Sequence, residues 1–387
     1  MAGVRAGGGV KRPPLRRRLL SIAHSYCVEL NRRLPQELAR AGDWDVVAVA
    51  PARFRGDFGW HVTEARPDEP CRVVPVPVHF SRRVHTMLYG RELARLLQQP
   101  WDLVHVWEEP YVAAAAQIAR ATAVRVPLVY ATFQNIAKRY PPPFAWFERY
   151  ALGRADGMIA YGDTSRAVLD EHGWSGRTRT IPPGVDINRF RPDPAARDRI
   201  RRELGWTDDV PVVGFVGRFV PEKGIARLTA ALDRLHAPWR ALFLGSGPLE
   251  ADIRAWSRQY GDRVRIHPAV SHDDVPAYLT AMDVLCAPSQ TTPKWREQFG
   301  RMLIEAFACG VPVLASDSGE IPHVVGDAGI VVGESDDRQW QDALGSLLDD
   351  RSRRADLGLR GRRRAESVYA WPVVARQHLA FFDELVR

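Results

Sequence analysis

Short apolar runs alternate with amphipathic stretches along almost the whole chain. In the first half, the apolar runs predict strands over residues 19–24, 46–50, 73–78, 103–107, 128–131 and 158–160. Helical periodicity separates most of these runs, for example over 91–98, 111–121 and 144–155. The second half repeats this order, with strands predicted over 212–216, 241–244, 264–267, 284–287, 311–315 and 330–332. Mostly apolar strands that alternate with helices indicate parallel sheets covered on both faces, and therefore an α/β fold.

The length and one punctuated segment divide this pattern into two domains. A chain of 387 residues is too long for one ordinary core. Prolines and a glycine interrupt the pattern over 181–192, before helical periodicity resumes over 193–204. We therefore expect an N-terminal α/β domain over 18–182 and a C-terminal one over 183–370. The helix predicted within 371–387 is too apolar to stand alone, so we expect it to pack back on the first domain.

The chain carries a formal net charge of +8, and the excess lies in Arg-rich stretches such as 16–18 and 360–364. Residues 1–17 are expected to form a disordered basic tail. Nucleic acid, an anionic membrane surface or phosphate-bearing ligands could attract this charge, and a solvated surface without a partner is the alternative. No nucleic-acid-binding motif accompanies the basic runs, so we expect no nucleic acid partner. Peripheral contact with an anionic membrane stays open.

The sequence also bears on the compartment. No apolar run is long enough to cross a bilayer, and the N-terminus lacks the apolar stretch of a secretory signal. Cys27, Cys71, Cys286 and Cys309 are scattered and form no CxxC pair, so neither a disulfide framework nor a zinc site is predicted. We expect a cytoplasmic protein, with any membrane contact peripheral and at the inner face.

Two carboxylates stand out in the segment 295–310. Residues 302–308 are apolar on almost every side apart from Glu305, so they predict a buried helix interrupted by a charge. An ionised carboxylate in such a place is destabilising unless a partner satisfies it. Glu297 lies earlier, beside a Phe-Gly pair suited to a turn before a helix. Either both carboxylates bind ligand hydroxyls at a helix start, or Glu297 caps the helix and Glu305 pairs with a nearby Arg.

Glycine-containing turns follow several predicted strands. The strand over 212–216 is followed by Gly217, Arg218, Lys223 and Gly224, just before a helix. Glycines permit close backbone approach, a helix start favours an anion, and two cations suit a diphosphate. The turn Gly245-Ser-Gly247 and the segment over 316–322 also lie between a strand and a helix. Open α/β sheets bind ligands at the carboxyl ends of their strands, so these loops predict a phosphate site.

Four motifs then occur in a fixed order. They are Gly184-Val-Asp186, Gly217-Arg218 with Lys223-Gly224, Gly245-Ser-Gly247, and Glu297-x7-Glu305 followed by Cys309-Gly-Val-Pro-Val-Leu-Ala-Ser316. In this order they resemble family 4 glycosyltransferases, which are retaining enzymes of the GT-B type. The resemblance covers essentially the whole C-terminal half, whereas only the general pattern holds in the N-terminal half. It implies two Rossmann-like domains facing across a cleft, the first for the acceptor and the second for a nucleotide sugar.

The resemblance also implies roles for individual residues. Arg218 and Lys223 would hold the donor diphosphate and stabilise the charge that builds on it as the sugar leaves. Glu297 would contact hydroxyls of the transferred sugar, and Glu305 would accept hydrogen bonds from the ribose. We therefore expect Arg218, Lys223 and Glu297 to be catalytic. Further donor contacts would come from Gly217, Gly245 and Gly247, from the backbone of Val270 near the base, and from that of Phe299, Gly300 and Arg301 near the sugar and phosphate.

The N-terminal domain departs from the family pattern. Gly-rich sequence usually follows the first strand of the family, but this chain has His24 there. Where a His is frequent after the strand over 128–131, it has Gln134 nearby. His24 and Gln134 are therefore candidates on the acceptor side. Glu108 and Glu109 end another strand and are candidate acceptor ligands or bases, with capping of the following helix as the alternative.

These observations favour a retaining glycosyltransferase that acts on a saccharide, lipid-linked or small-molecule acceptor in polysaccharide or glycolipid biosynthesis. The resemblance implies a nucleotide-diphosphate sugar as co-substrate, a UDP-sugar in preference to a GDP-sugar, and no further cofactor. Because Arg and Lys would neutralise the diphosphate, we expect no metal, and Asp43-Trp-Asp45 is interpreted as a turn. A nucleotide-sugar epimerase of the same fold and a non-catalytic nucleotide-sugar-binding subunit are the alternatives.

Overall fold

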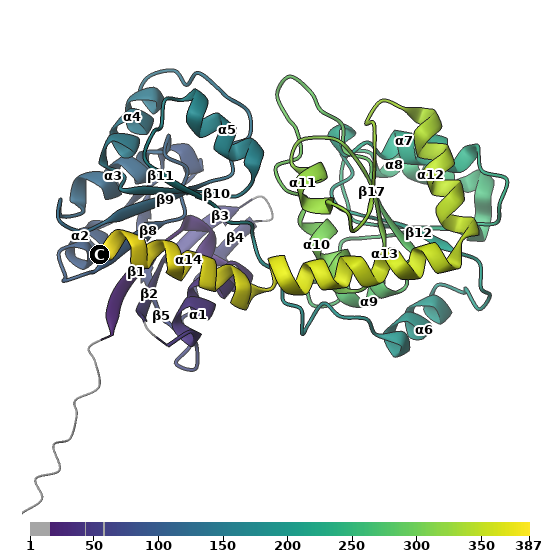
Figure 1. The fold of residues 1–387 in the computed structure, drawn as a ribbon, viewed down its shortest axis with the longest axis horizontal. Coiled ribbons are helices and arrows are strands. Elements are labelled where there is room, and N and C mark those ends of the chain that lie inside the picture. The colour runs from purple at the N-terminus through teal and green to yellow at the C-terminus, as the bar shows by residue number, and fades with distance from the viewer. Residues whose placement is uncertain (1–15, 43, 57–58) are drawn as a thin grey trace, which may run out of the picture.

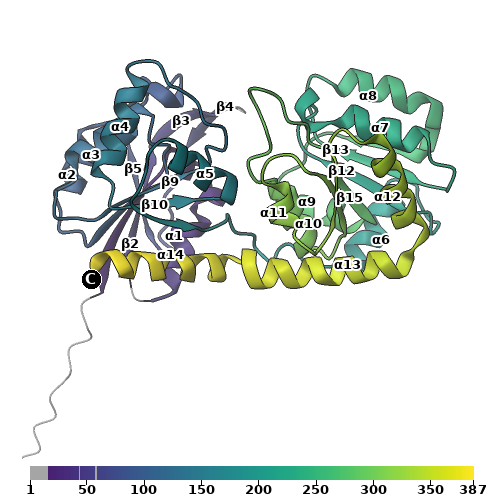
Figure 2. The ribbon, with the colours of Figure 1, turned by 45° about the horizontal axis from the view of Figure 1, so that its top comes forward.

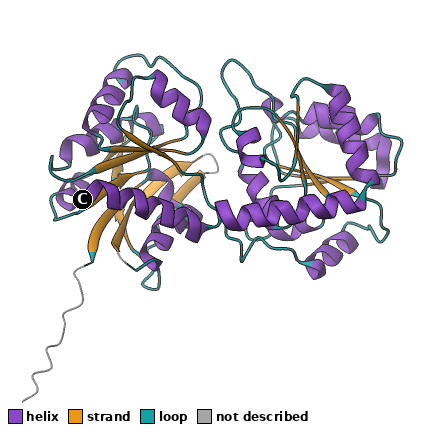
Figure 3. Cartoon of the chain, in the orientation of Figure 1, coloured by secondary structure: helices purple, strands orange, loops and turns teal. Residues whose placement is uncertain are grey.

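The computed structural model describes residues 16–42, 44–56 and 59–387, which form two α/β domains lying side by side (Figure 1). Each domain is built on one parallel sheet with helices packed around it (Figure 3). The central strands are mostly apolar; Leu19, Leu20 and Ile22 of the first strand are fully buried. Burial on both faces is what a parallel sheet between helices requires, so the predicted α/β architecture is confirmed.

The first sheet joins parallel strands from the N-terminal half of the described chain. Its order is β11 (Arg177–Thr180), β10 (Gly157–Ala160), β9 (Leu128–Thr132), β8 (Leu103–Val106), β1 (Arg17–Ile22), β2 (Trp44–Pro51) and β5 (Arg72–Val76). The accompanying helices are α1 (Arg33–Arg40), α2 (Arg91–Leu97), α3 (Ala113–Ala121), α4 (Phe144–Arg154) and α5 (Asp163–Glu171). Two short antiparallel pairs, β3 (Arg53–Gly56) with β4 (Gly59–Val62) and β6 (Val78–His79) with β7 (Leu88–Tyr89), extend from this domain.

The second sheet is also parallel and joins strands from the C-terminal half. Its order is β14 (Val264–His267), β13 (Arg240–Leu244), β12 (Val212–Val216), β15 (Val284–Ala287), β16 (Val313–Ser316) and β17 (Ile330–Val332). Its helices are α6 (Pro194–Glu203), α7 (Ile225–Asp233), α8 (Glu250–Ser257), α9 (Val275–Thr280), α10 (Arg301–Ala308), α11 (Ile321–Val325), α12 (Asp337–Asp349) and α13 (Arg351–Arg364).

The C-terminal helix returns to the first domain, as predicted. After α13, a π-helical turn over Ala365–Tyr369 leads into α14 (Trp371–Val386), and together they run along both domains (Figure 2). Phe381 and Phe382 of α14 are buried, and the Phe382 ring meets the Trp44 ring edge to face at 6.3 Å between centroids. Burial of these large rings accounts for the apolar character of the last helix.

The chain passes between the domains twice, and the two crossings are bonded to each other. The Val185 N–H donates to the Tyr369 carbonyl at 2.7 Å, and the Trp371 N–H donates to the Val185 carbonyl at 3.3 Å. A Cβ at Gly184 would lie 2.4 Å from the Trp371 ring, so this close packing requires a glycine. The Gly184-Val-Asp186 motif therefore has a structural role at the junction between the domains.

The structure corrects several details of the predicted elements. β1 ends at Ile22, and His24 begins a short 3₁₀ turn over His24–Cys27 in place of the last strand position. β3, β4, β6, β7 and β11 were not predicted; they are two to four residues long and partly exposed, so they carry little apolar signal. Most of the predicted basic tail, and Asp43, lie outside the described residues, while Arg17 begins β1. The four cysteines are buried free thiols, as their spacing predicts.

Candidate active site

A cavity of about 530 Å³ opens at the carboxyl ends of β12 and β13. Five residues predicted to bind the donor line it: Gly217, Arg218, Gly245, Gly247 and Val270. Most of the remaining lining is apolar or backbone, with Leu244, Pro248 and Ala269 among it. The loops that the sequence separates are thus brought together at one edge of the second sheet, where α/β folds bind ligands.

Close backbone contact between these loops depends on glycine. A Cβ at Gly245 would lie 1.9 Å from the Gly217 carbonyl oxygen, at a φ of +154° that L side chains rarely adopt. Gly224 has a φ of +67°, and a Cβ there would lie 1.8 Å from the Pro288 carbonyl oxygen. Because no side chain separates the loops, their backbone N–H groups can approach a bound phosphate closely.

Lys223 and Glu297 form an ion pair at the cleft. The Lys223 ammonium lies 2.5 Å from Glu297 Oε2, and the Ser289 hydroxyl donates to the same oxygen at 2.9 Å. Glu297 is 6% exposed, and the ammonium also lies 5.2 Å from the centre of the Trp295 ring. Since an isolated buried charge is costly, each group needs the other, or a ligand group of the same charge as its partner. Sequence analysis assigned the two residues separate roles and missed both this pairing and Ser289.

Glu305 also has a partner, but it is not an arginine. Its Oε1 lies 3.0 Å from Nε2 of His272, which packs against the Phe190 ring. The alternative in which Glu305 pairs with a nearby Arg is therefore wrong for this structure. Glu305 lines a second cavity of about 270 Å³, together with Arg301 and residues from both domains, including Arg33. His272 was missed because it follows β14 in a loop without a periodic signal.

The start of α10 places the remaining predicted donor residues. Gly300 has a φ of +80° and immediately precedes the helix, whereas Phe299 is buried against the Tyr369 ring. Glu297 lies outside α10, and no side chain caps the helix in the described structure, so the capping alternative for Glu297 is wrong. The Leu303 N–H donates to the Gly300 carbonyl at 2.9 Å, whereas the N–H groups before it can face a ligand beside Arg301.

On the opposite domain, His24 and Glu108 form a second charged pair. His24 Nδ1 lies 2.6 Å from Glu108 Oε2, and the His24 N–H and the Tyr89 hydroxyl donate to Glu108 Oε1. Burial alone would lower the pKa of His24, but the Glu108 carboxylate outweighs it and raises the pKa above the ordinary value. Glu108 is 2% exposed, so its contact with the cleft passes through His24.

Glu109 is held inside the first domain. The Thr132 hydroxyl donates to it at 2.6 Å and the Phe133 N–H donates at 2.8 Å. Burial raises the pKa of Glu109 to about 7, although these hydrogen bonds oppose the shift. Neither Glu108 nor Glu109 caps α3, whose N-cap is Val112 without a side-chain hydrogen bond. The capping interpretation of this pair is therefore wrong.

Gln134 does not cross the cleft, but its neighbour does. The Gln134 amide donates to the Ile136 carbonyl within the same loop at 2.7 Å. Asn135 donates from Nδ2 to the Glu297 carbonyl at 2.9 Å, and Gln298 donates back to the Phe133 carbonyl at 3.1 Å. The backbone of Glu297 is thus tied to the N-terminal domain, a contact that only the tertiary structure could show.

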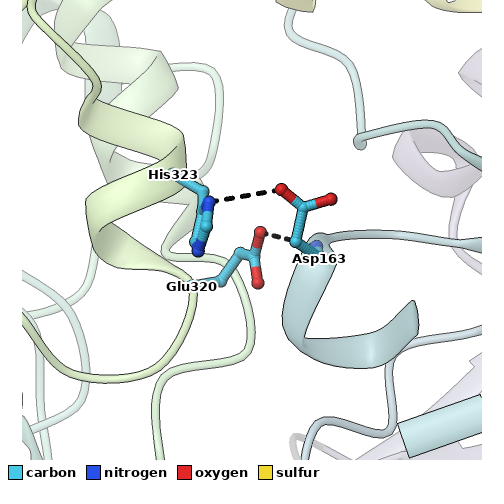
Figure 4. Close-up of side chains that lie close together, drawn as sticks. All are labelled: Asp163, Glu320 and His323. Atoms are coloured by element: carbon cyan, nitrogen blue, oxygen red, sulfur yellow. Dashed lines mark hydrogen bonds and ion pairs between the residues drawn. The ribbon is translucent and has the colours of Figure 1, made fainter. Parts of the chain in front are cut away.

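A third contact between the domains involves Asp163, Glu320 and His323 (Figure 4). Glu320 accepts hydrogen bonds from the backbone N–H groups of Asp163 and Thr164 at 2.9 Å and from the Thr164 hydroxyl at 2.5 Å. His323 lies 3.2 Å from Asp163. The potential ligand atoms of the three residues lie within 4.8 Å of one another. Both oxygens of Glu320 accept hydrogen bonds from the first residues of α5. Glu320 therefore caps this helix from the other domain and holds the two domains together here.

Comparison with known proteins identifies the family. The model of glycosyl transferases group 1 matches residues 196–364, and that of Glycosyltransferase Family 4 matches residues 28–189. A D-inositol 3-phosphate glycosyltransferase of Kineococcus radiotolerans is 32% identical over 333 residues, which cover 76% of this chain and 74% of that protein. This chain belongs to the family 4 glycosyltransferases. The prediction made from the motifs is therefore confirmed at the level of the family.

Other relatives of this glycosyltransferase match over a shorter length. A GDP-mannose-dependent monoacylated alpha-(1-6)-phosphatidylinositol monomannoside mannosyltransferase of Corynebacterium glutamicum is 34% identical over 204 residues, covering 51% of this chain and 54% of that protein. A D-inositol 3-phosphate glycosyltransferase of Xylanimonas cellulosilytica is 36% identical over 223 residues, 54% of this chain and 52% of that protein. The matches thus span about half the length of these two curated relatives.

Solved structures confirm the GT-B fold. Sucrose-phosphate synthase of Thermosynechococcus elongatus superposes with a TM-score of 0.72 at 24% identity, covering 96% of this chain and 99% of that one. Anabaena HepE, solved in complex with UDP, has a TM-score of 0.72 at 19% identity and covers 95% and 100% of the two chains. Among the described residues of this glycosyltransferase, no helix is both long and apolar enough to cross a membrane.

Proposed function

We propose that this chain transfers a hexose, with retention, from a nucleotide-diphosphate sugar to a saccharide, lipid-linked or small-molecule acceptor. The observation that carries the proposal is the Lys223–Glu297 pair beside a cavity lined by Arg218 and the glycine turns. The Lys223 ammonium and the Glu297 carboxylate, which could bind sugar hydroxyls, lie 2.5 Å apart, and Lys223 follows the loop with Gly217 and Arg218 that lines the cavity. A nucleotide sugar needs both groups at adjacent positions.

Charge stabilisation is the main chemical task of this site. Cleavage of the sugar–phosphate bond leaves negative charge on the diphosphate, and Arg218 and Lys223 are the cations placed to bind it. One preorganised donor of this kind lowers the activation barrier by about 3 kcal/mol. A bound diphosphate would compete with Glu297 for Lys223, so the carboxylate would turn to the sugar hydroxyls. In this proposal two cations perform the neutralisation, and no divalent metal takes part.

We propose retention without a covalent glycosyl intermediate, and the hydrogen bonding of the carboxylates supports this route. Glu297 is bonded to Lys223 and Ser289, Glu108 to His24 and Tyr89, and Glu109 to Thr132. None of these is left as a nucleophile for a covalent glycosyl intermediate of the glycosidase kind. We therefore propose that the acceptor attacks on the face from which the diphosphate leaves, and that the leaving phosphate accepts the acceptor proton.

The nucleobase of the donor can be identified by a direct test. The cavity lining includes no carboxylate among the described residues, so backbone groups such as those near Val270 would meet the base, and we keep the UDP-sugar proposal. The name of the corynebacterial relative favours GDP-mannose instead. We propose a cytoplasmic enzyme in either case, with any membrane contact limited to its surface.

A thermal-shift screen against UDP- and GDP-sugars tests the donor. The true donor should raise the melting temperature most, since a ligand that binds only the folded state stabilises it by mass action. Incubation of that donor with a panel of acceptors should then give free nucleotide and a glycosylated acceptor. NMR should show that the new glycosidic bond has the same anomeric configuration as the sugar–phosphate bond of the donor. An epimerised nucleotide sugar without transfer, or binding without turnover, would reject this function in favour of an epimerase or a binding subunit.

A further inference from the structure

The first domain contains a basic pocket that the donor chemistry does not use. It has a volume of about 690 Å³ and lies at the carboxyl end of β1, where His24 follows the strand. Its other walls come from the β3–β4 pair, with Arg55 and His61, and from the loop between β6 and β7, with Arg82 and Arg83. The pocket therefore combines three separate loops at the sheet edge where α/β domains bind ligands.

The charge of this pocket is almost all of one sign. Within the part of the chain that the structure describes, neither Arg82 nor Arg83 forms an ion pair with a carboxylate. Burial, Arg83 and Lys138 all lower the pKa of His85 on the same wall, which is the effect expected of a positive field. Clustered cations repel one another, so such an arrangement is stabilised when an anion occupies it.

His24 is positioned to donate into the pocket. Glu108 holds Nδ1 at 2.6 Å from behind, which fixes the ring and leaves Nε2 as the nitrogen that can reach a ligand. The side chain of His24 is 31% exposed, whereas that of Glu108 is 1% exposed. The carboxylate thus orients the ring and favours its charged form without presenting negative charge to the pocket. Glu108 acts here as a positioning residue.

We infer that this pocket binds a phosphate group carried by the acceptor. Guanidinium groups match the oxygens of a phosphate with paired, charge-assisted hydrogen bonds, and Arg82, Arg83 and Arg55 provide three of them. The inference rests on the proposed glycosyl transfer and adds the chemical class of the acceptor. The phosphate could belong to a soluble sugar phosphate or to a phospholipid headgroup. Trp60, next to His61 in β4, and Phe80, in the same loop as Arg82, are 54% and 72% exposed and could contact a lipid surface beside a headgroup.

Phosphate binding can be measured at His24 itself. Inorganic phosphate is titrated at constant pH and ionic strength into protein whose donor site is saturated with UDP or GDP, while NMR follows the His24 ring. We expect a saturable shift, and a Kd at least about tenfold weaker in Arg82→Gln/Arg83→Gln. The matched control is Arg120→Gln/Arg125→Gln, which removes two exposed arginines from the same domain, one in the last turn of α3 and one between α3 and β9. Its Kd should be unchanged.

Two competition arms then identify the source of the phosphate. Glucose 6-phosphate represents a soluble acceptor, and phosphatidylglycerol in phosphatidylcholine vesicles represents a lipid headgroup. The competitor that displaces inorganic phosphate from His24 identifies which of these two kinds of phosphate the pocket binds. Equal phosphate affinity in the two double variants, an unmoved His24 ring, or failure of both competitors would overturn the inference. Nucleotide affinity should be the same in all variants. If transfer is absent while phosphate still binds at His24, the proposed function fails and the pocket assignment stands.

Discussion

The two faces of the cleft handle charge in opposite ways. On the C-terminal face, Lys223 is paired with Glu297 and His272 with Glu305, and Arg218 lines the donor cavity without an ion pair among the described residues. On the N-terminal face, the carboxylates are withdrawn behind other groups, whereas Arg82 and Arg83 extend from a loop into an open pocket. A matched pair can exchange its partner for a ligand at little electrostatic cost, and an unmatched cluster favours a ligand that brings opposite charge.

This difference indicates how the work is divided. In the proposed function, the C-terminal face would recognise parts common to all nucleotide sugars, which are a diphosphate and neutral hydroxyls. The Lys223–Glu297 pair would supply a cation for the diphosphate and a carboxylate for the hydroxyls. In the same proposal the N-terminal face would select one acceptor, so its charge can be of one sign. Substitutions on the two faces should then have separable effects, on donor handling and on acceptor recognition.

The largest effect is expected at Lys223. Lys223→Ala should reduce turnover at least about 100-fold, because it removes a preorganised cation from the departing diphosphate. Phosphate binding at His24 should remain. Circular dichroism and the melting temperature check that the fold survives, and Lys223→Met/Glu297→Gln removes the whole pair in case Glu297 alone destabilises the variant. Wild-type turnover in Lys223→Ala would remove the basis for assigning the diphosphate to this face.

Glu305 provides the next test of the comparison. Glu305→Gln keeps the shape but removes the charge, and it should weaken nucleotide affinity about tenfold while phosphate affinity at His24 stays constant. Isothermal titration of both ligands measures the split. His272→Gln is the control, since it disrupts the same hydrogen bond from the other side. Unchanged nucleotide affinity in Glu305→Gln would make the pair a structural one.

The sequence predicts the donor loops of the C-terminal face but not the basic pocket of the N-terminal face. Gly217, Arg218 and Gly245 lie within two residues of the ends of apolar strands, so strand prediction alone brings them to one edge. The basic pocket depends on the β3–β4 pair and on the loop between β6 and β7, whose strands are too short and exposed to give a periodic signal. Partners such as His272 and Asn135 come from loops, and only the packed domains show which atoms they meet.

The smallest effect is expected at the contact that holds the two faces together. Glu320→Gln should weaken the cap on α5 by about 1 kcal/mol, because a neutral amide accepts the Asp163 and Thr164 N–H groups less well than a carboxylate. Amide exchange at these two positions should become faster, and the radius of gyration from solution scattering should rise as the domains separate more often.

Asp336→Ala provides the matched control for this contact. Asp336 caps α12 from within the C-terminal domain by accepting from the Gln339 N–H, so its loss should cost a similar free energy without changing the radius of gyration. In Glu320→Gln, KM for the acceptor and for the donor should rise together, since both faces lose the same closed arrangement. A rise in only one of them would show that Glu320 belongs to that face alone.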